Sequence, residues 1–155
     1  MQDRPKAASA FAWLFPLFSL LFVAGCSKDA SESVTVPTLS PEARLAMAPD
    51  TAKGQALFRE CAVCHETQNG ARHRVGPTLW GVYQQPAGNL ADFRYSNALK
   101  RSGVTWTEDQ LDAYIARPQS VIPGGRMSYR GMTNPADRRD LVAYLATLTD
   151  EPEGE

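Results

Sequence analysis

The sequence has few cysteines and few histidines, three and two respectively among 155 residues. Three cysteines are an odd and small number for a disulfide framework, which argues against a fold held together by disulfides. No segment alternates apolar and polar residues well enough to predict a strand, and there is no internal repeat and no nucleic-acid-binding motif. The formal charge of −1 and the 43% hydrophobic content are ordinary, and the length suits one domain with additional segments.

Two of the three cysteines stand in the pentapeptide Cys61-Ala62-Val63-Cys64-His65. This spacing is typical of the covalent attachment site of a c-type haem. Each thiol can add across one vinyl group of the porphyrin, and the two intervening residues let both sulfurs reach the same edge of the ring. His65 can then bind the iron through an imidazole nitrogen. The motif therefore predicts one covalently bound haem c.

Three other kinds of site could use the same residues. A thioredoxin-like redox pair needs a βαβ setting, which the flanking residues do not offer. A zinc site needs four ligands, and Cys61, Cys64, His65 and His73 are the only local candidates. A copper site would suit a β-sandwich, whereas this chain has helical patterns. His73 stands between two arginines, so we expect it at the surface rather than in a ligand role.

The N-terminal residues 1–25 resemble a bacterial lipoprotein signal peptide. A cationic start is followed by an apolar run over residues 7–24, and Val23-Ala24-Gly25-Cys26 resembles a lipobox. Cys26 would become the lipidated N-terminus. An ordinary signal peptide and an uncleaved membrane anchor are the alternatives, but Pro16 interrupts a run that is barely long enough to span a membrane.

The remaining chain divides into three parts by composition. Residues 26–50, rich in Ser, Thr, Pro and Ala, are expected to form the lipidated N-terminus and a flexible linker, with an inert Met47. Residues 51–149 form the domain, and residues 150–155 a mobile acidic tail. If Cys26 carries lipid and the other two cysteines carry haem, no thiol stays free, as suits an oxidising exported compartment.

The first part of the domain predicts one helix followed by irregular backbone. Asp50 or Thr51 can cap a helix over residues 51–63. Gly54 costs this helix about 1 kcal/mol relative to alanine, which is worthwhile if another backbone must approach closely. Residues 66–93 contain repeated Gly and Pro turn signals and little periodicity. Such a segment is suited to wrapping a flat cofactor.

The second part of the domain predicts further helices and places the fold in the all-α class. One or two helical turns are expected over residues 95–101. Residues 107–110 form a capping box that opens a helix, which Pro118 ends. Asn134-Pro135 caps and begins the last helix.

Met127 is the candidate for a second iron ligand. It lies 62 residues after His65, in a segment over residues 119–132 that we expect to be a loop. A thioether is a soft, neutral ligand that favours ferrous iron and raises the reduction potential. With both axial positions filled, the iron would gain or lose only an electron. Met132, five residues further on, is the rival ligand.

In these residues the chain resembles class I cytochromes c of the mitochondrial and cytochrome c2 type, over roughly residues 50–149. The matching residues are Gly54, Phe58, Gly76 to Gly81, Tyr95, Ser96, Trp106, Tyr114, Pro118, Ile122 to Gly124, Met127 and Leu141 to Leu145. The resemblance implies a small haem-wrapping fold with crossed N- and C-terminal helices and irregular loops. It also implies that His65 and Met127 are the axial ligands.

The resemblance assigns roles around the haem as well. The carbonyl of Pro77 would accept a hydrogen bond from the ring of His65 and so fix its orientation. Tyr95 and Trp106 would donate hydrogen bonds to a haem propionate, which offsets the cost of enclosing an anion. Tyr114 would lie near the axial sulfur.

The sequence departs from the mitochondrial pattern at three positions. Gln85 stands where that subgroup has an arginine near a propionate, and Leu99 stands where it has an asparagine. Gly125 replaces a hydroxyl residue close to the ligand. Because these changes remove polar partners, we expect Met127 to be held less tightly than in the mitochondrial proteins.

The expected function is electron transfer rather than catalysis. The resemblance and the N-terminal features together predict a monohaem cytochrome, lipid-anchored at the periplasmic face of a bacterial envelope. It would carry single electrons from a membrane oxidoreductase to an oxidase or reductase, and we expect neither nucleic acid nor a small-molecule substrate as partners. The alternatives are a peroxidase-like haem enzyme or gas sensor with a labile axial methionine, and a fixed electron-entry subunit of a larger membrane complex.

The charge distribution suggests the kind of redox partner. Residues 53–149 carry 12 Lys or Arg against 8 Asp or Glu, a net charge of +4. Six cations are expected to flank the haem edge, and we refer to them as the basic ring: Arg72, Arg74, Lys100, Arg101, Arg126 and Arg130. Such a ring could steer an acidic partner in a salt-dependent way.

Overall fold

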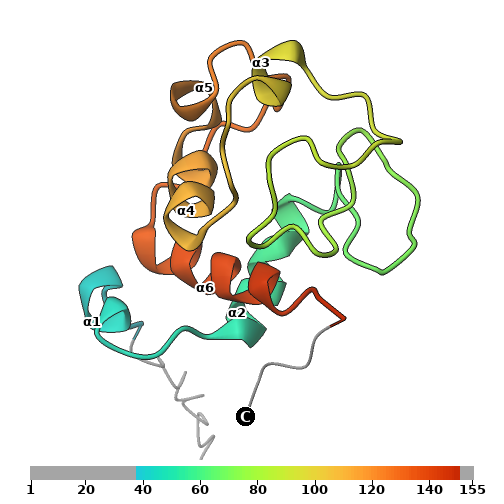
Figure 1. Ribbon diagram of the computed structural model, residues 1–155. Helices are drawn as coiled ribbons and strands as arrows, with labels where there is room; N and C mark the ends of the chain where they lie inside the picture. Colours follow the sequence, from blue (N-terminus) through green and yellow to red (C-terminus); the bar gives the residue numbers. More distant parts are fainter. Residues whose placement is uncertain (1–37, 151–155) are drawn as a thin grey trace, which may run out of the picture. The chain divides into compact units, whose positions relative to one another are not determined.

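Short helices joined by irregular segments make up residues 38–150, the part of the chain that the computed structural model describes (Figure 1). The helices are α1 Pro41–Leu45, α2 Thr51–Leu57, the 3₁₀ turn η1 Phe58–Glu60, α3 Asn97–Lys100, α4 Glu108–Ala116, α5 Pro118–Val121 and α6 Pro135–Ala146. Between residues 38 and 150 the backbone forms no strand, apart from an isolated bridge between Pro86 and Thr105. The predicted all-α class is confirmed.

The first and last helices of the domain, α2 and α6, pack across each other (Figure 1). Gly54 of α2 lies at their contact. A Cβ atom on Gly54 would lie 2.0 Å from the backbone oxygen of Asp140 and 2.8 Å from the Cβ of Tyr144. The close approach predicted for this glycine is therefore confirmed, because any side chain here would push the two helices apart. The rings of Phe58 and Tyr144 pack beside the crossing, with centroids 5.8 Å apart.

The helix caps predicted from the sequence are confirmed. The Thr107 side chain accepts a hydrogen bond from the Gln110 backbone at 3.3 Å and starts α4. Asn134 caps α6 by accepting from Ala136 at 3.0 Å and Asp137 at 3.3 Å. These caps fix where two helices of the core begin.

Two predicted element boundaries are wrong. The helix expected over residues 51–63 ends at Leu57 and tightens into η1, where the Cys61 N–H donates to the Phe58 carbonyl at 2.8 Å. The loop expected over residues 119–132 begins instead with α5, because the buried Pro118 occupies the first position of a new helical turn. Proline suits that position, since its missing N–H would have no partner there.

The flexible linker predicted for residues 26–50 is also wrong for its described part, residues 38–50. This part contains α1, whose Arg44 forms ion pairs of 2.5 Å with both Asp137 and Asp140 of α6. Asp140 is only 1% exposed and also accepts a hydrogen bond from the Asp50 backbone at 3.1 Å. The described chain upstream of residue 51 is thus joined to the last helix.

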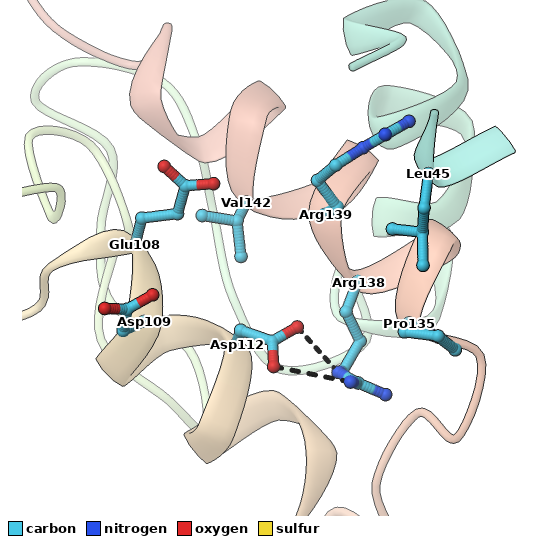
Figure 2. A pocket seen from close by; sticks show the side chains of 8 residues that line it. All are labelled: Leu45, Glu108, Asp109, Asp112, Pro135, Arg138, Arg139 and Val142. Atoms are coloured by element: carbon cyan, nitrogen blue, oxygen red, sulfur yellow. Dashed lines mark hydrogen bonds and ion pairs between the residues drawn. The ribbon is translucent and has the colours of Figure 1, made fainter. Parts of the chain in front are cut away.

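Burial is distributed unevenly along the domain. The buried apolar core comprises Phe58, Trp106, Leu111, Tyr114, Ile115, Ile122, Met132, Leu141, Val142, Leu145 and Leu148. No residue between positions 59 and 105 is fully buried. A pair between Asp112 of α4 and Arg138 of α6, 2.8 Å long, ties together the helices that carry this core (Figure 2).

The predicted signal peptide, residues 1–25, and Cys26 lie outside the described residues, as do residues 151–155 of the acidic tail. Asp150, the first residue of that tail, accepts a hydrogen bond from the Asn69 side chain at 2.9 Å. Within residues 38–150 no helix has both the length and the hydropathy that a membrane span requires.

Candidate haem site

The haem-attachment motif forms a tight turn directly after η1. The N–H groups of Cys64 and His65 both donate to the carbonyl of Cys61 at 3.0 Å, and neither Cys61 nor Cys64 forms a disulfide. Burial, with a smaller contribution from the nearby Glu60, raises the pKa of the Cys61 thiol to about 11. A redox-active pair of the thioredoxin kind depends on a lowered thiol pKa. Cys61 has the opposite property, so the thioredoxin-like interpretation is disfavoured.

The imidazole of His65 is oriented by Pro77. Its Nδ1 donates to the Pro77 carbonyl at 2.7 Å, which places the ring proton on Nδ1 and leaves the lone pair of Nε2 available for a metal. Burial lowers the pKa of His65, with partial compensation from the Pro77 hydrogen bond, so the ring is neutral as a ligand must be. A Cβ on Gly76 would lie 2.3 Å from the ring, which explains why a glycine precedes Pro77.

The segment that carries Pro77 is itself held in place from several sides. The Gly76 N–H donates to the Cys64 carbonyl at 2.8 Å, and the Leu79 N–H donates to the Glu66 carbonyl at 2.8 Å. The Thr78 N–H donates to Nδ1 of His73 at 3.0 Å. The carbonyl that orients His65 therefore belongs to a fixed piece of backbone.

His73 is not the surface residue that its arginine neighbours led us to predict. Its side chain is 18% exposed, and its ring packs edge-on against Phe93 at 5.1 Å. The buried Nε2 lies 3.0 Å from an Asp92 carboxylate oxygen, without the alignment of a hydrogen bond. His73 acts as a support for the Pro77 segment, a role that its local sequence does not signal.

The loop that carries Met127 is anchored in the core at both ends. Ile122 is 2% exposed, and the Met132 N–H donates to the Ile115 carbonyl at 3.0 Å. Met132 is itself a member of the buried core, whereas Met127 is partly buried at its edge. This placement favours Met127 over Met132 as the second ligand.

The same loop is tied to the turn that precedes the haem cysteines. The Tyr129 hydroxyl donates to the carboxylate of Glu60 at 2.9 Å. Burial and this contact raise the pKa of Tyr129 to about 12, so the hydroxyl keeps its proton at physiological pH. The two sides of the site, η1 and the Met127 loop, are linked directly.

Trp106 and Tyr114, predicted to surround the haem, pack together in the core with ring centroids 4.9 Å apart. Over residues 38–150 no hydrogen bond reaches the indole N–H of Trp106 or the hydroxyl of Tyr114. Neither donor atom is itself buried, since Nε2 of His73 is the one buried side-chain nitrogen or oxygen without a partner in residues 38–150. Burial also raises the pKa of Tyr114, so its hydroxyl remains a donor. The unpaired indole N–H suits the propionate contact that the resemblance implies for Trp106.

Tyr95, the other predicted propionate donor, lies next to Phe93. It is partly buried and packs edge-on against Phe93 at 4.8 Å, and burial raises its pKa. In the described part of the chain no hydrogen bond or ring contact joins it to Trp106. The structure thus brings Trp106 and Tyr114 together and places Tyr95 beside the His73 support.

The positions where the sequence departs from the mitochondrial pattern have structural roles. The backbone carbonyl of Gln85 accepts a hydrogen bond from the backbone N–H of Trp106 at 2.9 Å and so helps to position that residue. Leu99 is partly buried against the core. At these two positions the mitochondrial proteins have polar side chains. This chain has a backbone hydrogen bond at Gln85 and an apolar contact at Leu99 instead.

A haem fits these residues better than the alternatives do. Residues 59–105 include Leu79, Trp80 and Val82, yet none is fully buried by protein, and a flat apolar group would cover such side chains. In the part of the chain that the structure describes, no three His, Cys, Asp or Glu residues cluster as zinc would need. The all-α fold also lacks the β-sandwich that the copper interpretation requires.

A separate shallow pocket lies between α1, α4 and α6 and contains none of the predicted site residues. Figure 2 shows its lining, which mixes acidic residues of α4 with Arg138 and Arg139 of α6. Its strongest internal contact is the pair between Arg138 and Asp112, which is structural. We assign the candidate site to the surroundings of Cys61, His65 and Met127 instead.

Comparisons with known proteins agree with this geometry. The family model for Cytochrome c matches residues 51–149. Cytochrome c2 of Rhodomicrobium vannielii is 43% identical over 100 residues, which cover 64% of this chain and 80% of that protein. Cytochrome c of Chlamydomonas reinhardtii is 40% identical over 105 residues, which cover 67% and 94%. The solved structure of cytochrome cH from Methylobacterium extorquens matches with a TM-score of 0.60 and 39% identity, covering 63% of this chain and 98% of that one.

Proposed function

This chain belongs to the cytochrome c family, and from that premise we propose that it carries single electrons between membrane respiratory complexes while tethered to the membrane by lipid. Members of this family are monohaem electron carriers rather than enzymes and bind one covalently attached haem c. The haem supplies a one-electron iron couple when bound. What this chain contributes is attachment, axial ligands and a docking surface.

One observation carries the proposal, namely the orientation of His65. Its Nδ1 is engaged by the Pro77 carbonyl at 2.7 Å, in the turn that also presents Cys61 and Cys64. The ring is thereby fixed as a neutral ligand with one nitrogen available. We assign the two thiols to covalent attachment and His65 to the proximal axial position.

We assign the second axial position to Met127. Its loop is anchored at Ile122 and Met132 and tied to η1 through Tyr129, so its side chain can be held at a defined place. A filled second position leaves no open site for oxygen or peroxide, which suits a carrier. Trp106 and Tyr114 supply donors and apolar surface around the same group.

The docking surface differs from the predicted basic ring. Arg74 pairs with Glu66 at 2.5 Å and also donates to the Ala62 carbonyl at 2.7 Å, and Arg126 donates to the Arg94 carbonyl. Two of the six cations of the ring are thus engaged within the domain. Engaged cations still contribute to the long-range field, but they contribute less to direct pairing with a partner.

Two exposed valines lie beside the attachment turn. Val63 is 73% and Val75 is 81% exposed, and their segments are joined by the hydrogen bond from Gly76 to Cys64. Arg74 is the neighbour of Val75 in the chain, and a contiguous apolar patch with a charged rim is typical of an interaction site. We infer that the redox partner presents an apolar spot bordered by acids, and that its docking depends only moderately on salt.

The tether is shorter than the composition suggested, because α1 is docked on α6 by Arg44. If Cys26 is lipidated, residues 27–39 remain to connect it to the cap of α1 at Ser40. A fully extended chain of this length reaches at most about 45 Å. The proposed carrier therefore works close to the periplasmic face of the membrane, where its local concentration near partners is high.

Optical spectra of the matured full chain test the proposed carrier function. We expect a pyridine haemochrome typical of two thioether bonds, a low-spin spectrum in both oxidation states, and ferrous iron that does not bind carbon monoxide. Rapid binding of carbon monoxide by the unmodified protein would contradict the carrier function and favour a haem enzyme or gas sensor.

Fractionation of expressing cells tests the tether separately. We expect the protein in the membrane fraction and a Cys26→Ala variant in the soluble periplasmic fraction, with the haem spectrum unchanged. Membrane association that persists in the Cys26→Ala variant would contradict the lipid anchor without affecting the carrier assignment. Release of the unmodified protein as a single species by mild detergent would distinguish a carrier from a fixed subunit of a complex.

A further inference from the structure

Gln119, in the short helix α5, reaches across to the loop that carries Met127. Its side-chain nitrogen Nε2 lies 3.0 Å from the carbonyl oxygen of Gly125 and 3.2 Å from that of Met127. A glutamine amide has two N–H donors on one nitrogen, so a single side chain can satisfy both acceptors. Because both partners are carbonyl oxygens, only the amide nitrogen can face them.

The helix that carries Gln119 is well anchored. Pro118 at its first position is buried, and Ile122 directly after its last residue is 2% exposed. The Ile122 N–H closes the turn by donating to the Pro118 carbonyl at 2.9 Å. The backbone of Gln119 is therefore held in place, although its side chain is exposed to solvent.

The Met127 segment has few other attachments of its own. In the described chain, Gln119 makes the only hydrogen bond to the backbone of Met127. The neighbouring Gly125 donates to the Ile122 carbonyl at 3.0 Å, the Arg126 side chain donates to the Arg94 carbonyl, and Tyr129 contacts Glu60. Among these contacts, only the one from Gln119 acts on the backbone of Met127 itself.

We propose that Gln119 is a positioning residue that holds Met127 in place as the axial ligand. This inference rests on the proposed ligation by Met127. By binding the carbonyls of Gly125 and Met127, the amide restricts the loop and would keep the thioether where it can bind the haem iron. It lowers the population of open conformations in which the sulfur would leave.

The contact of Gln119 bears on Gly125, the third departure from the mitochondrial pattern. That glycine suggested a loosely held ligand because a hydroxyl side chain was missing. A Cβ on Gly125 would lie 3.0 Å from the Ile122 carbonyl oxygen, so the tight turn leaves little room for a side chain. The polar contact comes instead from Gln119, six residues earlier in the chain.

Two variants of the full-length ferric holoprotein test the role. Gln119→Ala removes both donors, and Gln119→Glu keeps the length but replaces the donors with a carboxylate that faces two carbonyl oxygens. The probe is the sulfur-to-iron charge-transfer band followed through an alkaline titration. Two lost hydrogen bonds at an exposed site correspond to about a tenfold fall in the ligated population, so the midpoint should fall by about one pH unit. Gln119→Glu should lower it at least as far.

Gln110→Ala is the matched control, because Gln110 is an exposed glutamine of α4 whose side chain makes no hydrogen bond within residues 38–150. Its midpoint should equal that of the unmodified protein. Hydrogen exchange should rise in Gln119→Ala over residues 123–131 only, which a general loss of stability would not produce. If Gln119→Ala does not mature, Gln119→Asn keeps the amide but shortens its reach and should give the same direction of change.

Unchanged midpoints in both Gln119→Ala and Gln119→Glu would overturn the proposal. A Met127→Ala variant separates that result from a failure of the proposed ligation. If Met127→Ala lacks the band while Gln119 variants behave like the unmodified protein, Met127 is the ligand and Gln119 does not position it. If Met127→Ala keeps the band, the assignment of the ligand itself fails, and the role of Gln119 fails with it.

Discussion

The crossing of α2 and α6 and the segment over residues 59–105 are built in opposite ways. At the crossing the polypeptide supplies its own core, and Leu141, Val142 and Asp140 are almost completely buried. Over residues 59–105 no residue is fully buried, although the segment carries Leu79 and Trp80. One half of the domain is thus completed by helix packing, and we propose that the haem completes the other half.

This difference in burial indicates where each half of the domain gains its stability. Full burial of a large apolar side chain contributes about 1.5–3 kcal/mol, which the segment 59–105 does not obtain from protein contacts alone. Any group that binds the folded but not the unfolded chain adds its binding free energy to stability. We therefore expect haem attachment and folding of residues 59–105 to be coupled, and the α2–α6 crossing to depend on it less.

Loss of haem attachment should give the largest effect. In the double variant Cys61→Ala/Cys64→Ala, the free energy of unfolding should fall by about 5 kcal/mol or more, a large part of the total for a domain of this size. Hydrogen exchange should become fast over residues 59–105, while α4 and α6 keep partial protection. The single variant Cys61→Ala, which retains one thioether, serves as the control. Equal loss of protection in both regions would contradict the contrast between them.

A side chain at the helix crossing should give the next largest effect. In Gly54→Val the new atoms would collide with the Asp140 backbone and the Tyr144 side chain, so we expect a loss of about 3–4 kcal/mol in denaturant unfolding. Gly70→Ala is the control. Gly70 has a positive φ of 71° and no atom within 4 Å, so its substitution should cost only about 1 kcal/mol. Similar losses in the two variants would show that the crossing does not require close contact.

Removal of Arg44 should have a smaller, pH-dependent effect. Burial raises the pKa of Asp140, but hydrogen bonds from Arg139, the Asp50 backbone and Arg44 outweigh it and hold the pKa below its ordinary value of 3.8. A lowered carboxyl pKa stabilises the fold above the unfolded-state pKa, and this contribution is lost as the pH falls through the folded-state pKa. In Arg44→Met we expect a loss of about 2 kcal/mol at pH 7 and acid unfolding that begins at higher pH.

Lys53→Met is the control for Arg44→Met. Lys53 is 40% exposed and lies 3.4 Å from Asp137, so its removal should cost under about 0.5 kcal/mol. The optical spectrum should stay unchanged in both variants, because neither touches the haem site. A spectral change in Arg44→Met would mean that the two regions are coupled more closely than their separate cores suggest.

The features that the sequence predicted are those with a local cause. The side chains of Thr107 and Asn134 each accept a hydrogen bond from a backbone N–H two or three residues later. Four adjacent residues therefore suffice to predict where each helix starts. Gly54 was recognisable because glycine in a helix carries a cost that needs a reason. The haem-attachment motif follows from chemistry that requires particular residue types at fixed spacing, whereas the axial role of Met127 stays a prediction that rests on the family resemblance.

The features that the sequence did not predict depend on contacts between distant residues. The helix α1 has no buried residue and is held through Arg44, whose partners lie 93 and 96 residues later in the chain. The two arginines beside His73 suggested solvent, whereas its burial comes from Phe93. The proposed role of Gln119 depends on the Met127 loop folding back against α5, which the local sequence does not indicate.

The ferric spectrum of Met127→Ala, compared with Met132→Ala, tests the central claim most directly. The claim is that one covalent haem, ligated by His65 and Met127, is both the missing core of residues 59–105 and the redox centre. We predict that Met127→Ala loses the sulfur-to-iron charge-transfer band and binds carbon monoxide when reduced, while Met132→Ala keeps the band despite lower stability. A band that survives in Met127→Ala, or disappears only in Met132→Ala, would contradict the claim.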